Sequence, residues 1–178
     1  MHIMVGYGGP AYREAKDKYR ADAERDPQAY LRATLAGSMR TDQNRFNILG
    51  EFGAIYFSLD RQTPLRELER TYRKFASTAN PEDISTPRIL MSFELRLESV
   101  ADLRNPSGCR KWGVSPLSVT GDDVAPCQEV DRRIRRTHEA IRWHSATGTG
   151  ENIAVFFDRL LPSSSVELLG IEEVELPL

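Results

Sequence analysis

The sequence has few of the residues that cross-link small proteins or bind metals. Its 178 residues include only two cysteines, Cys109 and Cys127, and three histidines. Two cysteines are too few for a disulfide framework or a structural zinc site. The spacing of His2, His138 and His144 gives no ligand cluster, whereas a catalytic zinc needs about three protein ligands. We therefore expect no metal in this protein.

Long apolar runs and an excess of one charge are also missing. No segment approaches the roughly 20 apolar residues of a membrane-spanning helix, and the first ten residues do not resemble a signal peptide. The 24 basic and 26 acidic residues give a net charge of -2, which argues against a dedicated nucleic-acid binder. Walker, dinucleotide-binding, zinc-protease and serine-hydrolase motifs are absent. These absences predict a cytoplasmic protein that contacts neither membranes nor nucleic acid directly.

The remaining composition is that of one globular domain, with 40% hydrophobic and 28% charged residues. Residues 1–10 contain three glycines and a proline, and we expect them to form a flexible leader before a single domain over residues 11–178. Residues 11–36 are rich in helix formers. They predict an N-terminal helical segment in two pieces, divided at Asp26–Pro27, where the aspartate can cap the second helix.

The rest of the chain mixes strands and helices. Five apolar residues between Ile89 and Leu97 alternate with other residues, which is the period of a strand. The pattern predicts strands over residues 54–59, 89–97, 153–157 and 166–174, and helices from Thr63 to Ala76 and from about Cys127 to Ile141. Because regular crossover connections are not evident, the fold class is predicted as α+β.

Three residues suited to chemistry follow one another at equal intervals. Arg45 lies in an Asn-Arg-Phe-Asn turn, Tyr56 in the first strand-like run and Glu67 in the helix that follows. Farther on, Ser145 precedes a glycine-containing turn that ends at Asn152.

Each of these residues also has an ordinary structural interpretation. Arg45 suits a solvated surface, Glu67 suits an exposed helix flank beside Arg70, and Tyr56 suits the core. Ser145 is typical of a polar turn.

Taken together, the order and spacing of these motifs resemble the RES domain, a family named for an arginine, a glutamate and a serine. Members carry a Gly-Arg-[Trp/Phe]-[Asn/Asp] turn, a strand that ends in an exposed tyrosine, a helix with a glutamate, and a segment with Ser-Ala followed by Gly-x-Asn. These features correspond here to Asn44–Asn47, Tyr56, Glu67 and Ile141–Asn152, and Glu98–Arg104 resembles a further strand end of the family. The resemblance extends from about Tyr30 to the C-terminus.

The resemblance implies a fold like that of the ADP-ribosyltransferases, with two packed, mainly antiparallel sheets, surrounding helices and a cleft for NAD. It implies the toxin of a bacterial toxin–antitoxin pair that cleaves NAD, as substrate, at the nicotinamide–ribose bond. The result is either NAD degradation, by hydrolysis or phosphorolysis, or mono-ADP-ribosylation of a protein such as an enzyme of nucleotide metabolism. The implied partner is an Xre-type helix-turn-helix antitoxin that occludes the active site.

The resemblance also implies catalytic roles for three residues. Glu67 would stabilise the positive charge that develops on the ribose when the bond to nicotinamide breaks. Arg45 would grip the diphosphate through its guanidinium fork. Tyr56 offers a flat face for nicotinamide and a hydroxyl.

Further residues are expected to bind NAD. Arg32 is the candidate for the family's first-strand arginine, with Arg20 and Arg40 as alternatives. Ser58 is expected to contact NAD. Ser145 is expected either to hydrogen-bond NAD or to hold Glu67 in its rotamer.

Two functions from other classes are considered as well. A RES fold without catalysis would serve as a binding module in a regulatory complex with a DNA-binding antitoxin, and an unrelated α+β fold would serve as a small-ligand binding protein. The basic run Arg132–Arg136 predicts a solvated helix face or a contact surface for an acidic partner.

Overall fold

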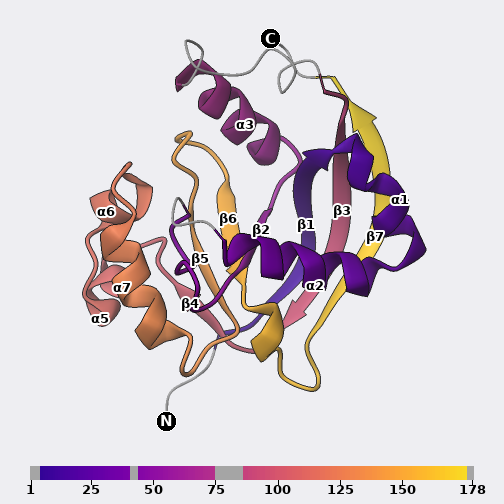
Figure 1. The fold of residues 1–178 in the computed structure, drawn as a ribbon. Helices are drawn as coiled ribbons and strands as arrows, with labels where there is room; N and C mark the ends of the chain where they lie inside the picture. Colours follow the sequence, from indigo (N-terminus) through magenta and orange to yellow (C-terminus); the bar gives the residue numbers. More distant parts are fainter. Residues whose placement is uncertain (1–4, 41–43, 75–85, 176–178) are drawn as a thin grey trace.

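The computed structural model describes residues 5–40, 44–74 and 86–175, and its elements confirm the α+β class (Figure 1). The strands are β1 (Tyr7–Lys16), β2 (Ile55–Ser58), β3 (Arg88–Leu97), β4 (Val100–Asp102), β5 (Ala140–His144), β6 (Glu151–Val155) and β7 (Ser165–Val174). The helices are α1 (Arg20–Arg25), α2 (Pro27–Ser38), α3 (Thr63–Lys74), α5 (Pro106–Trp112), α6 (Pro116–Thr120) and α7 (Ala125–Ile134), with short 3-10 turns at Asp17–Tyr19 and Phe157–Arg159. Within these described ranges no helix is long and apolar enough to span a bilayer.

The described strands form one sheet, not the two packed sheets that the resemblance implied. Its order is β4-β5-β6-β2-β1-β3-β7, and the neighbours are antiparallel except for β4 and β5. The join between β2 and β1 is narrow, because it has a single registered pair, Tyr12 with Ser58. The sheet therefore has two halves that are connected at one point and diverge beyond it.

The N-terminal prediction is wrong for residues 7–16. They are not leader and helix but strand β1, which pairs residue by residue with β3 from Tyr7 opposite Leu97 to Lys16 opposite Arg88. The Ala-, Glu- and Lys-rich composition favours a helix only weakly, and ten residues of backbone pairing override it. Helix starts only at Arg20.

Two helical layers cover the sheet and bury separate apolar clusters. Helix α2 begins as predicted, because the Asp26 side chain accepts a hydrogen bond from Ala29 N at 2.9 Å. It buries Tyr30 and Leu31 in a cluster that includes residues of β1, β3 and β7 and also one set of side chains from β2, β5 and β6. Helices α5 and α7 pack in the other cluster, around Trp143. The cleft described below lies between the two halves of the sheet.

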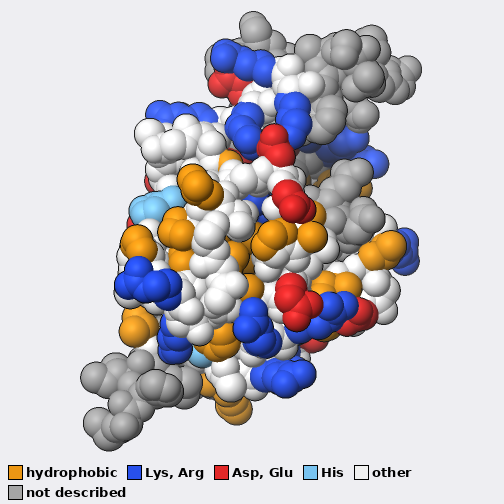
Figure 2. Space-filling view, turned by 90° about the vertical axis from the view of Figure 1, so that its left-hand side faces the viewer, with side chains coloured by type: hydrophobic (Ala, Val, Ile, Leu, Met, Phe, Trp, Pro, Cys, Tyr) orange, Lys and Arg blue, Asp and Glu red, His pale blue; other side chains and the backbone are white. Residues whose placement is uncertain are grey.

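The C-terminal part of the predicted helix from Cys127 to Ile141 is also wrong. Helix α7 ends at Ile134, and residues 140–144 form β5, since Ile141 and Trp143 pair with β6. The basic run at this helix end is not a uniform solvated face either. Arg135 is 5% exposed and lies between the rings of Phe52 and Phe156. On the surface that carries α5–α7, Lys and Arg side chains are dispersed among hydrophobic and acidic ones (Figure 2).

Candidate active site

A cleft of about 360 Å³ opens where β1 and β2 diverge. Its walls come from β1, β2, the turn before β2, helix α3, strands β5 and β6 with the turn between them, and the residue that precedes α7. The lining residues are Tyr12, Arg13, Glu14, Asn44, Arg45, Tyr56, Phe57, Ser58, Pro64, Glu67, Leu68, Thr71, Val124, Trp143, Ala146 and Asn152. The structure thus brings Arg45, Tyr56, Ser58 and Glu67, which the sequence singled out, to one site.

The start of α3 is fixed against the turn between β5 and β6, and this contact places Glu67. Asp60 caps the helix by accepting hydrogen bonds from the backbone N and the hydroxyl of Thr63, at 2.9 and 2.6 Å. Burial opposes ionisation of Asp60, but these hydrogen bonds outweigh it and lower its pKa. Gly150 has φ of +80°, and a Cβ there would lie 1.9 Å from Thr63 Oγ1. Only glycine therefore lets the turn approach α3 this closely.

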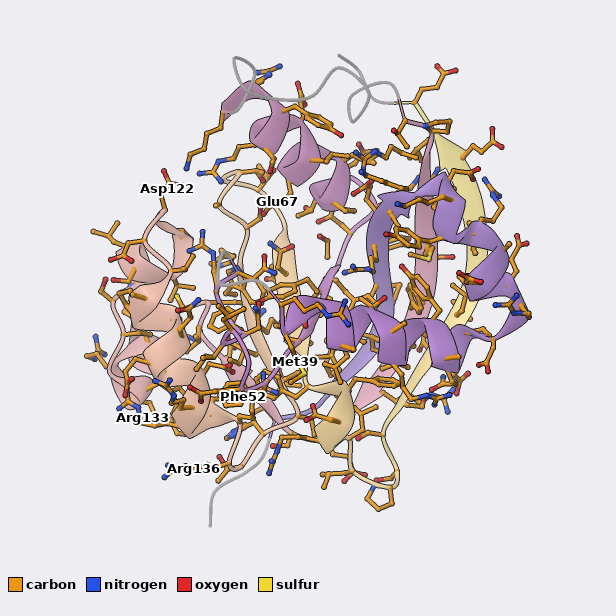
Figure 3. The ribbon with its side chains drawn as sticks, viewed as in Figure 1. Met39, Phe52, Glu67, Asp122, Arg133 and Arg136 are labelled. Atoms are coloured by element: carbon orange, nitrogen blue, oxygen red, sulfur yellow. The ribbon has the colours of Figure 1, made fainter. Side chains whose placement is uncertain are left out.

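The Glu67 carboxylate is held by two side chains at the place where α3 meets that turn (Figure 3). Its Oε1 accepts hydrogen bonds from Ser145 Oγ at 2.5 Å and from Asn152 Nδ2 at 2.9 Å. Two roles were considered for Ser145, to bind NAD or to hold Glu67. The structure contains the hydrogen bond that the second role requires. Arg70, the neighbour considered for an ordinary surface pair with Glu67, instead contacts Asp122 at 3.3 Å.

Ser58 also lies in this network. Its hydroxyl donates to Asn152 Oδ1 at 2.8 Å, and both side chains are less than a tenth exposed. The single Ser58 hydroxyl proton is therefore used inside the protein. A direct hydrogen bond between Ser58 and NAD remains a prediction. In such a bond, NAD would have to donate and the Ser58 oxygen would accept.

Tyr56 presents its ring to the cleft, while its hydroxyl is bound within the protein. The hydroxyl donates to Asn47 Oδ1 at 3.0 Å and accepts from Phe46 N at 2.7 Å. Burial raises the pKa of Tyr56 far above its usual range, so the hydroxyl stays protonated. The ring stands edge-on to Trp143, at 6.1 Å between centroids. These contacts leave the face of Tyr56, rather than its hydroxyl, for a ligand.

Buried contacts from α2 and α7 hold the turn that carries Arg45. Gln128 donates to Asn44 O at 3.1 Å, and Asn47 donates to Ser38 O at 2.9 Å. From the end of α7, Arg135 donates to Phe46 O at 3.3 Å and to Gly53 O at 2.9 Å. Arg135 is thus a structural residue of the site, which the sequence did not indicate.

Arg45 itself is half-buried in the cleft wall. Its Nη1 is buried and has no hydrogen-bond partner among the residues that the structure describes. A buried donor of this kind is costly unless a ligand or water satisfies it.

Arg13 is an arginine of the first strand that lines the cleft, whereas Arg32, the candidate from the sequence, lies on α2; a contact of Arg32 with NAD stays a prediction. Arg13 lies on β1, lines the cleft, and spans the opening by donating from Nη1 to Tyr56 O at 3.0 Å. Its Nε is buried without a partner. Arg32 is exposed on α2 and does not line the cleft, and neither do the alternatives Arg20 and Arg40. The sequence analysis missed Arg13 because it assigned residues 11–16 to a helix.

A second, larger cavity of about 920 Å³ lies beside the first, between β1 and helices α1 and α2. The two cavities share Arg13, Glu14, Asn44 and Tyr56 as lining residues. At their common wall, Glu14 forms a buried ion pair with Arg88 at 2.8 Å, and burial raises the pKa of Glu14 despite that partner. Arg13 therefore lines two neighbouring cavities.

Comparisons with known proteins agree with this arrangement. The family model described as the RES domain matches residues 11–177. Among solved structures, a chain of the M. tuberculosis MbcT–MbcA toxin–antitoxin complex has a similar fold, with a TM-score of 0.71 and 21% sequence identity. That alignment covers 96% of this chain and 86% of the other. Comparison with curated proteins gives no match.

The resemblance inferred from the motifs is confirmed, since the family match spans nearly the whole chain. The solved structure supports the same fold independently of sequence similarity. This chain belongs to the RES-domain family.

Proposed function

We propose that this protein is the toxin of a toxin–antitoxin pair and that it cleaves NAD between nicotinamide and ribose. One observation carries the proposal. A single cleft is lined by Glu67 and by two arginines from different elements, Arg13 and Arg45. Membership of the RES family supports it, because the resemblance implies NAD as the substrate.

The charges of the cleft suit the diphosphate of NAD. Phosphate oxygens would accept charge-assisted hydrogen bonds from the guanidinium groups of Arg13 and Arg45, which both line the cleft, and bonds of this kind are stronger than neutral ones. The two arginines come from different elements, β1 and the turn before β2. A ligand with two linked phosphates fits such a pair better than a single small anion does.

The two neighbouring cavities suit the two halves of a dinucleotide. Ligand sites usually enclose about 300–1,000 Å³, and the smaller cavity, at about 360 Å³, lies at the lower limit. We place the nicotinamide riboside half there, beside Glu67 and Tyr56. The adenosine half then occupies the larger cavity beyond Arg13.

The chemistry requires stabilisation of positive charge. When NAD is bound, nicotinamide leaves with the electron pair of the glycosidic bond, and positive charge develops on the ribose. The Glu67 carboxylate stabilises that charge. Tyr56 provides a flat apolar surface for nicotinamide, since its hydroxyl is already bound by Phe46 and Asn47.

The ribose then forms a bond to an oxygen atom, which releases its proton to the surrounding solvent or a nearby base. Water or phosphate as the acceptor gives NAD degradation, and a protein side chain gives mono-ADP-ribosylation. Mass spectrometry of the products distinguishes the three outcomes. The reaction is run in buffer alone, with added phosphate and with a cell extract.

An antitoxin that covers the cleft would keep such an enzyme silent. We propose an Xre-type helix-turn-helix partner. The similar chain in the MbcT–MbcA structure belongs to a toxin–antitoxin complex, which supports a partner of this kind. A carboxylate of the partner inserted at Arg13 and Arg45 would compete directly with NAD phosphates. Co-expression with the neighbouring gene product should then give a stable complex without NAD-cleaving activity.

Expression in a cell without the antitoxin tests the proposed function. We expect induction of the wild-type chain to lower cellular NAD and to stop growth, while Glu67→Gln at the same soluble level does neither. If the wild-type chain accumulates with NAD and growth unchanged, the proposal fails. That result would favour a non-catalytic binding module.

A further inference from the structure

The two oxygens of the Glu67 carboxylate have different surroundings. Oε1 accepts two hydrogen bonds, from Ser145 and from Asn152. No residue in the described parts of the chain donates a hydrogen bond to Oε2, and Glu67 lines the cleft. The free oxygen is therefore the one available to a ligand.

The amide of Asn152 can take only one useful orientation. An ionised Glu67 is purely an acceptor, so it requires the Nδ2 donor of Asn152 rather than its oxygen. Asn152 Oδ1 then faces the opposite way and needs a donor, which the Ser58 hydroxyl supplies at 2.8 Å. A directed chain of hydrogen bonds runs from Ser58 through Asn152 to Glu67.

The backbone fixes this chain in place. Ser58 and Asn152 are directly opposite each other in the antiparallel pairing of β2 with β6. Their side chains are 5% and 9% exposed, so solvent does not compete strongly for these hydrogen bonds. Glu67, by contrast, lies on α3 and must be held across a gap between elements.

We propose that Asn152, oriented by Ser58, is a positioning residue that fixes Glu67 with Oε2 directed to the cleft. The inference rests on the proposed function, in which Glu67 stabilises charge on the ribose. Ser145 restrains the same Oε1 from the other side. Without the amide, one hydrogen bond holds a side chain that has several rotatable bonds, and the carboxylate can turn away from the ribose.

Asn152→Asp separates this role from a merely structural one. Aspartate keeps the shape and still accepts from Ser58, but when ionised it has no donor for Glu67 and repels the Glu67 carboxylate, so Oε1 loses this anchor. Ser58→Ala, in contrast, leaves the donor and removes the group that orients it. We expect kcat for NAD cleavage to fall roughly 10- to 100-fold in Asn152→Asp and less in Ser58→Ala. KM should change less than about twofold in both variants, because positioning acts on the transition state.

Matched controls lie elsewhere in the chain. Asn105 caps α5 by accepting from Gly108 N, and aspartate caps equally well, so Asn105→Asp should leave kcat unchanged. Ser92 on β3 donates to Gly170 O and does not line the cleft, so Ser92→Ala should also be neutral for activity.

A crystal structure of Asn152→Asp gives a readout that does not depend on activity. We expect Glu67 to leave its wild-type rotamer or to divide between two. The inference is overturned if Glu67 keeps one wild-type rotamer in Asn152→Asp, even where the wild type fails to cleave NAD. It is also overturned if kcat is unchanged, or if KM alone rises, which would make Asn152 a substrate contact. The proposed function fails separately, if Glu67→Gln retains activity.

Discussion

Replacing Arg13 is a sharp test of the cleft, because the structure and the sequence pattern point to different arginines. Arg13 reaches from β1 to the carbonyl of Tyr56 and has a buried Nε without a partner. Arg32 is exposed on α2, outside the cleft. Arg13→Ala should weaken NAD binding, whereas Arg32→Ala should have no effect.

The magnitude follows from one charge-assisted contact. A hydrogen bond to a charged group contributes about 1.5–3 kcal/mol, and each 1.4 kcal/mol changes affinity about tenfold. The dissociation constant for NAD should therefore rise roughly 10- to 100-fold in Arg13→Ala. Arg13→Lys should recover part of this loss, since it keeps the charge but not the planar fork.

Isothermal titration calorimetry in a Glu67→Gln background measures binding without turnover. Arg13→Ala also loses its hydrogen bond to Tyr56 O. A loss of about 1 kcal/mol would lower Tm by about 2–4 °C, so the folded fraction is checked by circular dichroism. If folded Arg13→Ala and the protein with Arg13 bind NAD with equal affinity, Arg13 does not bind the NAD diphosphate and the proposal for this residue is refuted. A marked loss of NAD affinity in Arg32→Ala would instead support the sequence-based prediction that Arg32 binds NAD.

Three further predictions concern the turn, the larger cavity and a buried acid. Gly150→Ala should lower kcat, because its Cβ would collide with Thr63 and push the turn that carries Ser145 away from α3; an unchanged kcat would contradict this. Ala33→Trp should raise KM for NAD but not for nicotinamide mononucleotide, because Ala33 lines the larger cavity; Ala36→Trp, outside that cavity, is the control. Burial raises the pKa of Asp131 to about 7, above its unfolded value of about 3.9. The folded state therefore holds the extra proton, and the free energy of unfolding should fall as pH rises from about 4 to 7. Urea unfolding of wild type and Asp131→Asn measures this dependence, which the variant should lack.

Local signals in the sequence were sufficient for several elements. The alternation from Ile89 to Leu97 predicted β3, and Asp26–Pro27 predicted the start of α2, because strand period and helix caps depend on neighbouring residues. The motif order likewise placed Arg45, Tyr56 and Glu67 in one cleft, as the structure has them.

Features that depend on distant partners could not be predicted in this way. Strand β1 exists because it pairs with β3, a strand far along the chain, as Tyr7 opposite Leu97 illustrates. Its helix-favouring composition concealed Arg13 as a cleft residue. The hydrogen bond from Asn152 to Glu67 likewise joins residues far apart in sequence. This contact depends on how α3 packs against the turn between β5 and β6, and the neighbouring Ser58–Asn152 contact depends on the register of β2 with β6; no local pattern specifies either.

Release of free nicotinamide from NAD tests the central claim most directly. In Glu67→Gln, the side-chain oxygen can still accept from Ser145 and Asn152, so the fold should be retained while the negative charge is lost. Chromatography should detect nicotinamide from the purified wild-type protein and a loss of at least about 100-fold in the variant. Wild-type protein that is folded, free of antitoxin and unable to release nicotinamide would contradict the account, as would full activity in Glu67→Gln.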